Sequence, residues 1–425
     1  MRLRFLHAAD VHLDSPMRGL ERYEGAPVPE IRAATRRALE NLVALAIDEA
    51  VDFVLLAGDL YDGDWRDYNT GLFFSGEMGR LHEAGIPVFL IAGNHDAASQ
   101  ITKALRAPPN LHSFGTGAPE TRVIEDLGVA IHGRGFPTRS VTEDLSRGYP
   151  QAVPGLFNIG LLHTSLDGRP GHEPYAPCNL DGLRAKGYQY WALGHVHQHE
   201  LVARDPYVVF PGNTQGRHIR ETGAKGCVLV RVEGGEVVEV EQRALDVVRW
   251  TICTLDVDDV RTPDQIYPLV ERALIHAADA AEGRLLAARL RLSGRCRIHS
   301  RLHADHEHLL NESRALVPTI GADSVWIEKL VVDTQPEGAE SQLSRDDAFG
   351  GLLRSIRDLE LNEERLSGLS AEMEPLALKL PSALRTGDDP FDPSRPEYLH
   401  GCLEDVKAVL IERLLGRNDT PDRSG

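Results

Sequence analysis

The feature that most constrains this chain is a series of five short motifs in which polar, metal-competent residues follow an apolar run. The seven candidate ligands in these motifs offer nitrogen or oxygen and no sulfur. They are Asp10, His12, Asp59, Asn94, His163, His195 and His197. An apolar run that ends in such residues is typical of a buried strand in a layered α/β core, and ligands gather at the carboxyl ends of such strands. The series therefore indicates a metal site.

The spacing within the motifs favours a pair of ions. Asp10 and His12 are two residues apart, as are His195 and His197, and at a strand end this spacing puts both side chains on one face. Asp59 is the natural bridging carboxylate, because it can give one oxygen to each ion. Nitrogen and oxygen ligands suit Mn²⁺, Fe or Zn. We expect two divalent metal ions, with Mn²⁺, Fe and Zn left open at this point.

The chemistry expected of such a pair is phosphoester hydrolysis. Two ions about 3.5–4 Å apart bind a phosphate oxygen and a hydroxide for in-line attack, so no protein general base is needed. His95 directly follows Asn94 and is left over from the ligand set. We expect His95 to donate a proton to the leaving oxygen or to stabilise charge there. Asp96 is the next residue and is placed to orient His95.

These motifs resemble those of a known family, the calcineurin-like metallophosphoesterases. The residues that carry the resemblance are Asp10-Val-His12, Gly58-Asp59, Gly93-Asn94-His95-Asp96, the lone His163 and Gly194-His195-Val-His197. The resemblance covers residues 3–245. Within the superfamily the chain looks like the SbcD-type DNA repair exonucleases, and most like the YhaO-type subgroup. The finer match includes Pro211-Gly-Asn-Thr-Gln-Gly-Arg-His218.

The resemblance implies a fold, a substrate and a ligand assignment. The fold would be α/β, a four-layer α/β/β/α sandwich, and the substrate would be DNA. One ion would be held by Asp10, His12, Asp59 and His197. The other would be held by Asp59, Asn94, His163 and His195, with His95 catalytic. One position departs from the pattern: SbcD-type nucleases commonly carry a His three residues past the bridging Asp, where this chain has Asp62. The role of Asp62 in handling phosphate stays open.

Composition shifts divide the chain into three expected parts. Residues 1–245 would form the dimetal phosphoesterase domain. Residues 246–335 show a β-α-β-α-β order, which suits a small α+β capping domain that contacts DNA. Residues 336–425 would form a helical tail with apolar stripes over 346–366 and 397–415, interrupted by a Pro-rich linker over 381–396. We expect this tail to bind a partner, and packing on the chain's own domains is the alternative.

A basic stretch lies in the second part. No acidic residue occurs from Arg284 to Ala304. Within it Arg289 and Arg291 alternate with leucines, and Arg295 follows, which is the pattern of a strand with one basic face. Such a face would hold DNA phosphates without reading sequence. A solvated outer face of the small domain is the alternative.

Composition limits the partners and the compartment. The chain has 46 Lys and Arg against 64 Asp and Glu, a net charge of −18, which argues against DNA binding by bulk positive charge. The five cysteines form no CxxC pair, and neither a signal peptide nor a membrane span is found, which favours a cytoplasmic protein without membrane contact. The chain has no GxxxxGK[ST] motif for ATP. The resemblance supplies an SMC-type coiled-coil ATPase (SbcC-like) as partner, and a homodimer stays open.

The function that we expect is Mn²⁺-dependent hydrolysis of DNA phosphodiester bonds in DNA repair. It would be exonucleolytic, and endonuclease activity on single strands stays open. One alternative within the same chemistry is a phosphatase or a cyclic-nucleotide phosphodiesterase. An alternative of another class is a non-catalytic scaffold that binds proteins, against which the full ligand set argues.

Overall fold

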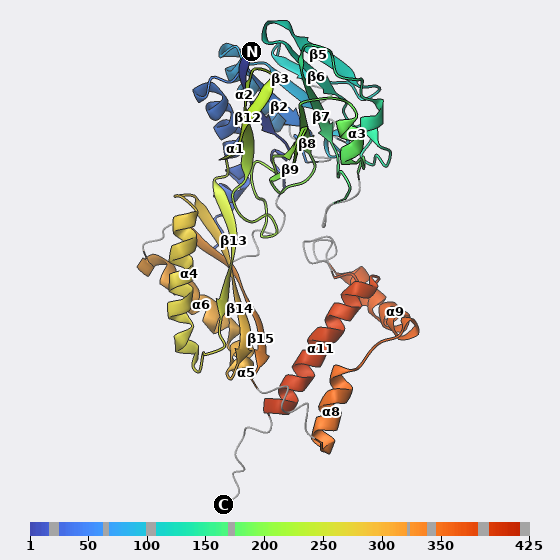
Figure 1. The fold of residues 1–425 in the computed structure, drawn as a ribbon. Coiled ribbons are helices and arrows are strands. Elements are labelled where there is room, and N and C mark those ends of the chain that lie inside the picture. Colours follow the sequence, from blue (N-terminus) through green and yellow to red (C-terminus); the bar gives the residue numbers. More distant parts are fainter. Residues whose placement is uncertain are drawn as a thin grey trace, which may run out of the picture. The chain divides into compact units, whose positions relative to one another are not determined.

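The structure of the protein is a computed structural model (Figure 1). It describes residues 1–16, 25–62, 68–98, 108–168, 175–320, 324–337, 346–380 and 391–416. Contacts divide the chain into two compact units. The first holds the N-terminal strand, residues 27–251 and residues 283–287, and the second holds most of the chain from residue 252 onward. The division into three domains stays a prediction, and residues 381–390 of the expected linker lie outside the described residues.

The first unit contains two six-stranded sheets. The strands of one sheet, in spatial order, are β12 (Glu236–Ala244), β11 (Gly226–Glu233), β1 (Arg2–Ala8), β2 (Phe53–Ala57), β3 (Val88–Ile91) and β4 (Leu111–Ser113). Strands β1 to β4 are parallel, whereas β11 is antiparallel to both β1 and β12. The N-terminal strand therefore lies inside the sheet, next to a strand that comes more than 200 residues later.

The second sheet is also mainly parallel. Its strands, in spatial order, are β5 (Glu120–Ile124), β6 (Val129–Gly133), β7 (Phe157–His163), β8 (Tyr190–Gly194), β10 (Tyr207–Phe210) and β9 (Glu200–Arg204). Strands β6, β7, β8 and β10 run parallel, and the two edge strands β5 and β9 are antiparallel to their neighbours. In both sheets the carboxyl ends of the parallel strands can thus gather side chains at one edge.

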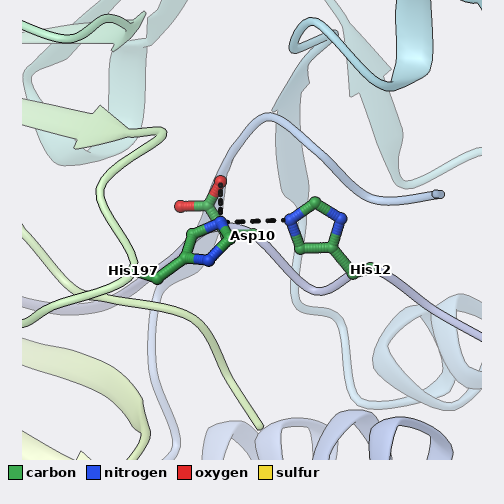
Figure 2. Close-up of side chains that lie close together, drawn as sticks. All are labelled: Asp10, His12 and His197. Atoms are coloured by element: carbon green, nitrogen blue, oxygen red, sulfur yellow. Dashed lines mark hydrogen bonds and ion pairs between the residues drawn. The ribbon is translucent and has the colours of Figure 1, made fainter. Parts of the chain in front are cut away.

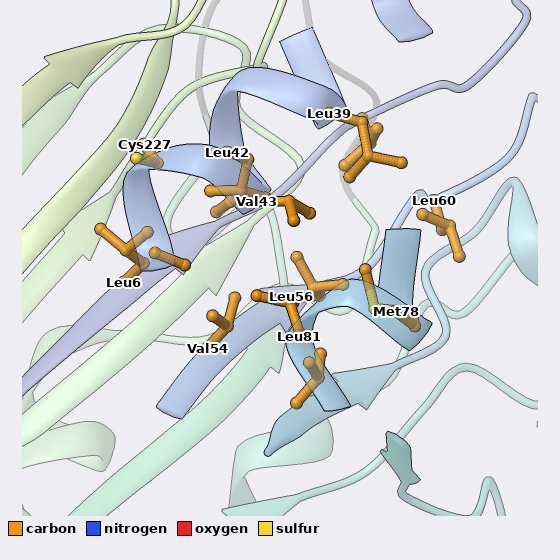
Figure 3. Close-up of a cluster of buried hydrophobic side chains, with 14 of the residues drawn as sticks. Leu6, Leu39, Leu42, Val43, Val54, Leu56, Leu60, Met78, Leu81 and Cys227 are labelled. Atoms are coloured by element: carbon orange, nitrogen blue, oxygen red, sulfur yellow. The ribbon is translucent and has the colours of Figure 1, made fainter. Parts of the chain in front are cut away.

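Two helices cover the outer face of the first sheet. Helices α1 (Val28–Asp48) and α2 (Tyr68–Glu83) pack there, and their buried side chains meet those of β1 and β2 (Figure 3). Leu42 of α1 and Met78 of α2 are almost completely buried in this cluster. Each such side chain contributes about 1.5–3 kcal/mol relative to an exposed one. The helices end where this apolar face ends, so burial of one stripe explains their extent.

Alternation along the strands builds the core between the sheets. In β2, Val54 and Leu56 face the helices, whereas Phe53 and Leu55 face the second sheet. Phe5 of β1 stacks on Phe53 with ring centroids 5.0 Å apart. A strand buried on both faces reads as a continuous apolar run, which is why the sequence shows runs rather than alternation.

The outer face of the second sheet carries a third apolar cluster. Trp191 and Phe210 of the sheet pack there against loop segments and the short helix α3 (Leu180–Arg184). Figure 1 shows α1 and α2 on one side of the two sheets and α3 on the other. The predicted four-layer α/β/β/α sandwich is therefore confirmed, with a fourth layer that is largely irregular.

A buried histidine links the two sheets beside their carboxyl ends. The Nδ1 of His7 lies 3.0 Å from the hydroxyl of Tyr190, and its Nε2 lies 3.0 Å from the carbonyl of Leu193. Burial lowers the pKa of His7 to about 3, so the imidazole is neutral and donates one hydrogen bond and accepts another. This link fixes the end of β1 relative to the end of β8, the two strands that lead to Asp10 and His195.

A three-stranded sheet, most of whose residues belong to the second unit, has the order β13 (Val248–Asp256), β14 (Leu285–Cys296) and β15 (Val325–Pro336). Helices α5 (His299–Ala304) and α6 (His306–Leu316) contact β15, and α4 (Tyr267–Ala280) contacts α6. The strands and helices occur in the predicted β-α-β-α-β order, except that the second helix is divided into α5 and α6.

The tail is helical. Its helices are α8 (Ala348–Arg357), α9 (Glu363–Lys379) and α11 (Pro396–Gly416), and α11 contacts both of the others. The helical tail is therefore confirmed, although α9, which has Pro375 inside it, was not expected as a separate helix. Among the described helices, none is both long enough and apolar enough to cross a membrane.

Candidate metal centre

The predicted ligands meet at the carboxyl ends of five strands in the first unit. Asp10 and His12 follow β1, Asp59 follows β2 and Asn94 follows β3, all in the first sheet. His163 ends β7, and His195 and His197 follow β8, all in the second sheet. Because the two sheets pack face to face, both sets of strand ends contribute to one site.

The first group of donors surrounds His197 (Figure 2). The Nε2 of His197 lies 3.2 Å from the Nε2 of His12 and 3.9 Å from Oδ1 of Asp10. The Nε2 of His12 also lies 4.0 Å from Oδ2 of Asp59. Asp10, His12 and Asp59 are each about 1% exposed. Two imidazoles and two carboxylates with their donor atoms this close together form a suitable set of ligands for one divalent cation.

The second group shares Asp59 with the first. The Nε2 of His163 lies 2.9 Å from Oδ1 of Asn94 and 3.5 Å from Oδ2 of Asp59. The backbone N–H of His195 donates to Oδ2 of Asp10 at 2.9 Å, and its ring lies edge-on to that of His163. The same Asp59 oxygen thus faces both His12 and His163, so Asp59 is placed to bridge two ions through Oδ2 rather than by giving one oxygen to each as expected.

Hydrogen bonds behind two of the imidazoles select the tautomer that a metal needs. The Nδ1 of His163 lies 2.9 Å from the carbonyl of Ala57, which can only accept, so Nδ1 carries the proton. The Nδ1 of His197 lies 2.7 Å from Oε1 of Glu221. Both Nε2 atoms are then left with a lone pair directed into the site. The chemistry of the donor set therefore fits divalent metal ions.

Backbone strain is concentrated at the candidate ligands. Asp10 has φ 51°, His12 φ 43°, Asp59 φ 52° and His195 φ 102°, all in the left-handed region that ordinary side chains avoid. Strain of this kind costs of the order of 1–3 kcal/mol per residue and persists where the surrounding structure holds it for a function.

The glycines of the motifs are required by close approaches. A Cβ on Gly58, which has φ 92°, would lie 2.5 Å from the Nδ1 of His163. A Cβ on Gly194 would lie 1.9 Å from the carbonyl oxygen of Ala57. Any side chain at these positions would displace His163 or the strand ends, so the glycines set the spacing between the two sheets at the site.

The buried charges of the site perturb one another. Burial disfavours a charge on His163, but the Asp59 carboxylate outweighs it and raises the pKa of His163 to about 9. Burial raises the pKa of Asp10. A divalent cation would replace the proton on His163, so metal binding here releases protons.

His95 is placed at the rim of the donor groups and pairs with Asp62. The Nδ1 of His95 lies 2.9 Å from Oδ1 of Asp62, close enough to pair charges. Asp62 also accepts a hydrogen bond from Ser15 at 2.7 Å. Burial opposes protonation of His95, but Asp62 and then Asp59 outweigh it, and the pKa of His95 is raised. His95 is 27% exposed, so substrate can reach it.

Asp96 has a different environment from the one expected. Its buried carboxylate accepts hydrogen bonds from the backbone N–H groups of Leu60, Tyr61 and Gly93 at 2.9–3.1 Å. It therefore joins the loop after β2 to the loop after β3, which carry Asp59 and Asn94. The carboxylate that faces His95 is that of Asp62, three residues after Asp59, for which the sequence alone suggested no role.

The predicted basic face lies on β14 in the second unit, and the charges of Arg289 and Arg291 are paired. Arg289 makes two hydrogen bonds to Glu328, at 2.6 and 2.7 Å. Arg291 pairs with Asp333, and both side chains are about half exposed. The backbone N–H of Arg295 donates to Asp258. The absence of acidic residues within 284–304 is thus compensated by carboxylates from other segments of the same unit.

Sequence reasoning missed Glu221. Its carboxylate accepts from His197, from the backbone N–H of Arg217 at 2.7 Å and from Asn213 at 2.9 Å. It is 6% exposed. A single Glu gives no recognisable pattern in a sequence. The one available indication was its position three residues after the Gly-Arg-His218 segment.

Comparison with known proteins agrees with this geometry. The family model described as calcineurin-like phosphoesterase matches residues 3–199, and the model of the metallophosphoesterase YhaO middle domain matches residues 250–335. The chain is 34% identical over 365 residues to metallophosphoesterase YhaO of Bacillus subtilis, which covers 85% of this chain and 88% of the relative. It is 26% identical over 276 residues to the DNA double-strand break repair protein Mre11 of Sulfurisphaera tokodaii, covering 61% of this chain and 67% of the relative. With these matches and a metal-competent site in the family's motifs, the chain belongs to the calcineurin-like metallophosphoesterases and is a metal-dependent hydrolase of phosphoesters.

Proposed function

We propose that this metallophosphoesterase hydrolyses DNA phosphodiester bonds with two Mn²⁺ ions. The observation that carries the proposal is the position of Asp59, which faces His12 in one donor group and His163 in the other. DNA as the substrate is supported by two relatives described as DNA double-strand break repair protein Mre11, from Sulfurisphaera tokodaii and Methanosarcina mazei. The second of these is 25% identical over 279 residues, which cover 64% of this chain and 43% of the relative.

Two groups of side chains would hold the ions. Asp10, His12, Asp59 and His197 would form one set, and Asp59, Asn94, His163 and His195 the other. Bound together, two such ions supply an activated hydroxide and neutralise charge on the phosphate. The chain's own contribution is to fix the ligands: Glu221 orients His197, and the carbonyl of Ala57 orients His163.

His95 would protonate the leaving oxygen. Its raised pKa favours the protonated imidazole, which is the form that a general acid needs. Asp62 would orient the ring from one side, and Asp96 would position the loop that carries His95. His95→Asn should therefore slow hydrolysis by about 10²- to 10⁴-fold without loss of metal.

The basic face of β14 would contribute contacts to DNA phosphates. Arg291 is the side chain best suited to this, because it is half exposed and an exposed ion pair such as that with Asp333 is worth only about 0–1 kcal/mol. Arg289 would have to leave a better-buried partner, Glu328. Reversal of Arg289, Arg291 and Arg295 to Glu should weaken DNA binding for all sequences. It should flatten the salt dependence by about one unit of slope per lost contact.

The tail would bind an SMC-type coiled-coil ATPase. Several large apolar side chains of the tail are exposed: Leu352, Leu369, Leu376, Val406 and Leu410 on its helices, and Leu359 between α8 and α9. An apolar surface of this kind favours a protein partner. Deletion of residues 340–425 should abolish co-purification with that ATPase and leave Mn²⁺-dependent hydrolysis of a small ester intact. A truncated chain that melts far lower than the full chain would contradict a partner-binding role.

One assay panel tests the proposed activity. The purified chain is incubated with Mn²⁺ and, separately, end-labelled duplex DNA, single-stranded DNA, a cyclic dinucleotide and a phosphopeptide. Degradation of DNA that stops in chelator and in His95→Asn supports the nuclease. His82→Asn is the matched control, because His82 is exposed on α2 away from the site. Cleavage of only the cyclic dinucleotide or the phosphopeptide would contradict the nuclease and favour a phosphodiesterase or phosphatase.

A further inference from the structure

The loop after β10 brings a nearly buried arginine into the metal centre. Arg217 is 14% exposed, and its Nη2 lies 3.1 Å from Oε1 of Glu221 and 3.5 Å from the Nδ1 of His197. Its Nη1 lies 3.8 Å from Oδ2 of Asp62. The guanidinium is therefore beside a proposed metal ligand and beside the carboxylate that pairs with His95.

The hydrogen-bond capacity of this guanidinium is only partly used. An arginine side chain offers five N–H donors and no acceptor. Nη2 donates to Glu221, whereas Nη1 is too far from Asp62 for a hydrogen bond. The Nε is buried and has no hydrogen-bond partner in the part of the chain that the structure describes. Buried donors are normally satisfied, so unused donors next to a reaction site suggest a ligand that supplies acceptors.

The position of Arg217 is fixed before any ligand binds. Glu221 holds both its backbone N–H, at 2.7 Å, and its Nη2. Glu221 is itself held by Asn213 at 2.9 Å. A planar fork in a fixed position matches the geometry of phosphate oxygens better than a flexible ammonium group does.

We propose that Arg217 binds a non-bridging oxygen of the substrate phosphate, next to the two metal ions. This proposal rests on the proposed phosphoester hydrolysis and deepens it, because it assigns a third source of positive charge at the scissile group. The unused N–H groups of Nη1 and Nε would donate to the phosphate, while Glu221 keeps the guanidinium in place. Charge that develops on the phosphate oxygens during attack would then be stabilised by donors that need no rearrangement.

The alternative is that Arg217 serves only to hold Glu221 and, through it, His197. The two roles differ in what a substitution removes. If Arg217 is purely structural, it is needed to retain the metal ions. Its substitution would then weaken phosphate binding only because an ion is lost. A phosphate-binding arginine would be needed for phosphate affinity while both ions stay bound.

The test uses the full-length chain loaded with Mn²⁺ and inorganic phosphate as the probe. Calorimetric titration gives the phosphate Kd, and elemental analysis gives the ions bound per chain. For Arg217→Gln we expect phosphate binding weaker by about 10- to 100-fold with the ion content unchanged. Arg217→Lys, which keeps a point charge, should recover part of the affinity. Arg220→Gln is the matched control in the same loop, because Arg220 is exposed, and it should stay within about twofold of the wild type.

Three results would overturn the proposal. The first is a wild type that binds no phosphate when loaded with Mn²⁺. The second is an unchanged phosphate Kd in Arg217→Gln. The third is a loss of affinity that only follows a loss of bound Mn²⁺. Hydrolysis of bis(p-nitrophenyl) phosphate should fall by about 10²- to 10³-fold in Arg217→Gln. If the loaded wild type binds phosphate through Arg217 but cleaves no DNA, the nuclease function fails and the phosphate site stands.

Discussion

Removal of the charge on Glu221 should weaken one metal site and destabilise the fold around it. The carboxylate accepts from four groups: His197 Nδ1 at 2.7 Å, the backbone N–H of Arg217 at 2.7 Å, Asn213 at 2.9 Å and Arg217 Nη2 at 3.1 Å. In Glu221→Gln the amide N–H₂ replaces one acceptor oxygen, so at least one of these donors loses its partner. The buried charge of Arg217 also loses its counter-charge.

The magnitude follows from these contacts. Loss of the group that orients a metal-binding histidine typically reduces metal affinity by about 10- to 100-fold, which corresponds to about 1.4–2.7 kcal/mol. An uncompensated buried charge costs about 3–5 kcal/mol. Arg217 is 14% exposed and lies near Asp62, so the loss of stability should be smaller than this range. We therefore expect about 2–3 kcal/mol from urea unfolding in chelator.

The assays are Mn²⁺ titration by calorimetry and urea unfolding of the metal-free chain. Glu233→Gln is the control, because Glu233 pairs with Arg2 at the surface, where the two side chains are 51% and 81% exposed. That change should alter stability by less than about 1 kcal/mol. If Glu221→Gln binds both ions with wild-type affinity, the orienting role of Glu221 is refuted. If its unfolding free energy matches that of Glu233→Gln, the argument from buried charge is refuted.

Three further predictions test the site and the tail. Asp59→Ala should leave neither ion tightly bound, whereas His12→Ala should lose one ion. Elemental analysis that finds the same number of ions lost in both variants would contradict a bridging Asp59. His163 has a pKa of about 9, above the 6.5 of a free imidazole. Its protonated form therefore contributes stability to the metal-free chain that is fully present below pH 6.5 and is lost as the pH rises through 9. Mn²⁺ binding must release that proton, so its affinity should rise by up to about tenfold per pH unit from pH 7 to 9, and calorimetry that finds no rise would count against His163 as a ligand. Replacement of Val406 and Leu410, which are 52% and 43% exposed, by Ser should abolish capture of the proposed SMC-type ATPase partner with little change in melting temperature. A large drop in melting temperature would place these side chains in the chain's own core.

The strand-end motifs made the first unit predictable, because each apolar run followed by a polar donor marks both a buried strand and its carboxyl end. The apolar runs at 51–57 and 87–92 match β2 and β3 closely for this reason. Strand β12 escaped notice because most of its side chains are exposed, so its sequence carries no apolar run. Elements at an edge of the fold leave weaker patterns than those in its core.

Within the site, the candidate ligands could be identified from the sequence but their supporting residues could not. Asp96 was expected to orient His95 because it is adjacent in the chain, whereas the structure shows Asp62 facing the ring. Adjacent residues in a loop point in different directions, and contacts across 33 residues leave no local pattern. Glu221 behind His197 is a similar case, since its role depends on the path of a loop rather than on spacing.

The place of β1 between β2 and β11 has a consequence for synthesis on the ribosome. Arg2 pairs with Glu233, so β1 must wait for a strand made more than 200 residues later before one of its edges is covered. At about 5–20 residues per second, that interval is on the order of ten seconds or longer. Until then the nascent chain presents an unpaired apolar edge, which other chains or a chaperone can bind. Fragments that end before residue 226 should therefore aggregate even though they contain all seven candidate ligands.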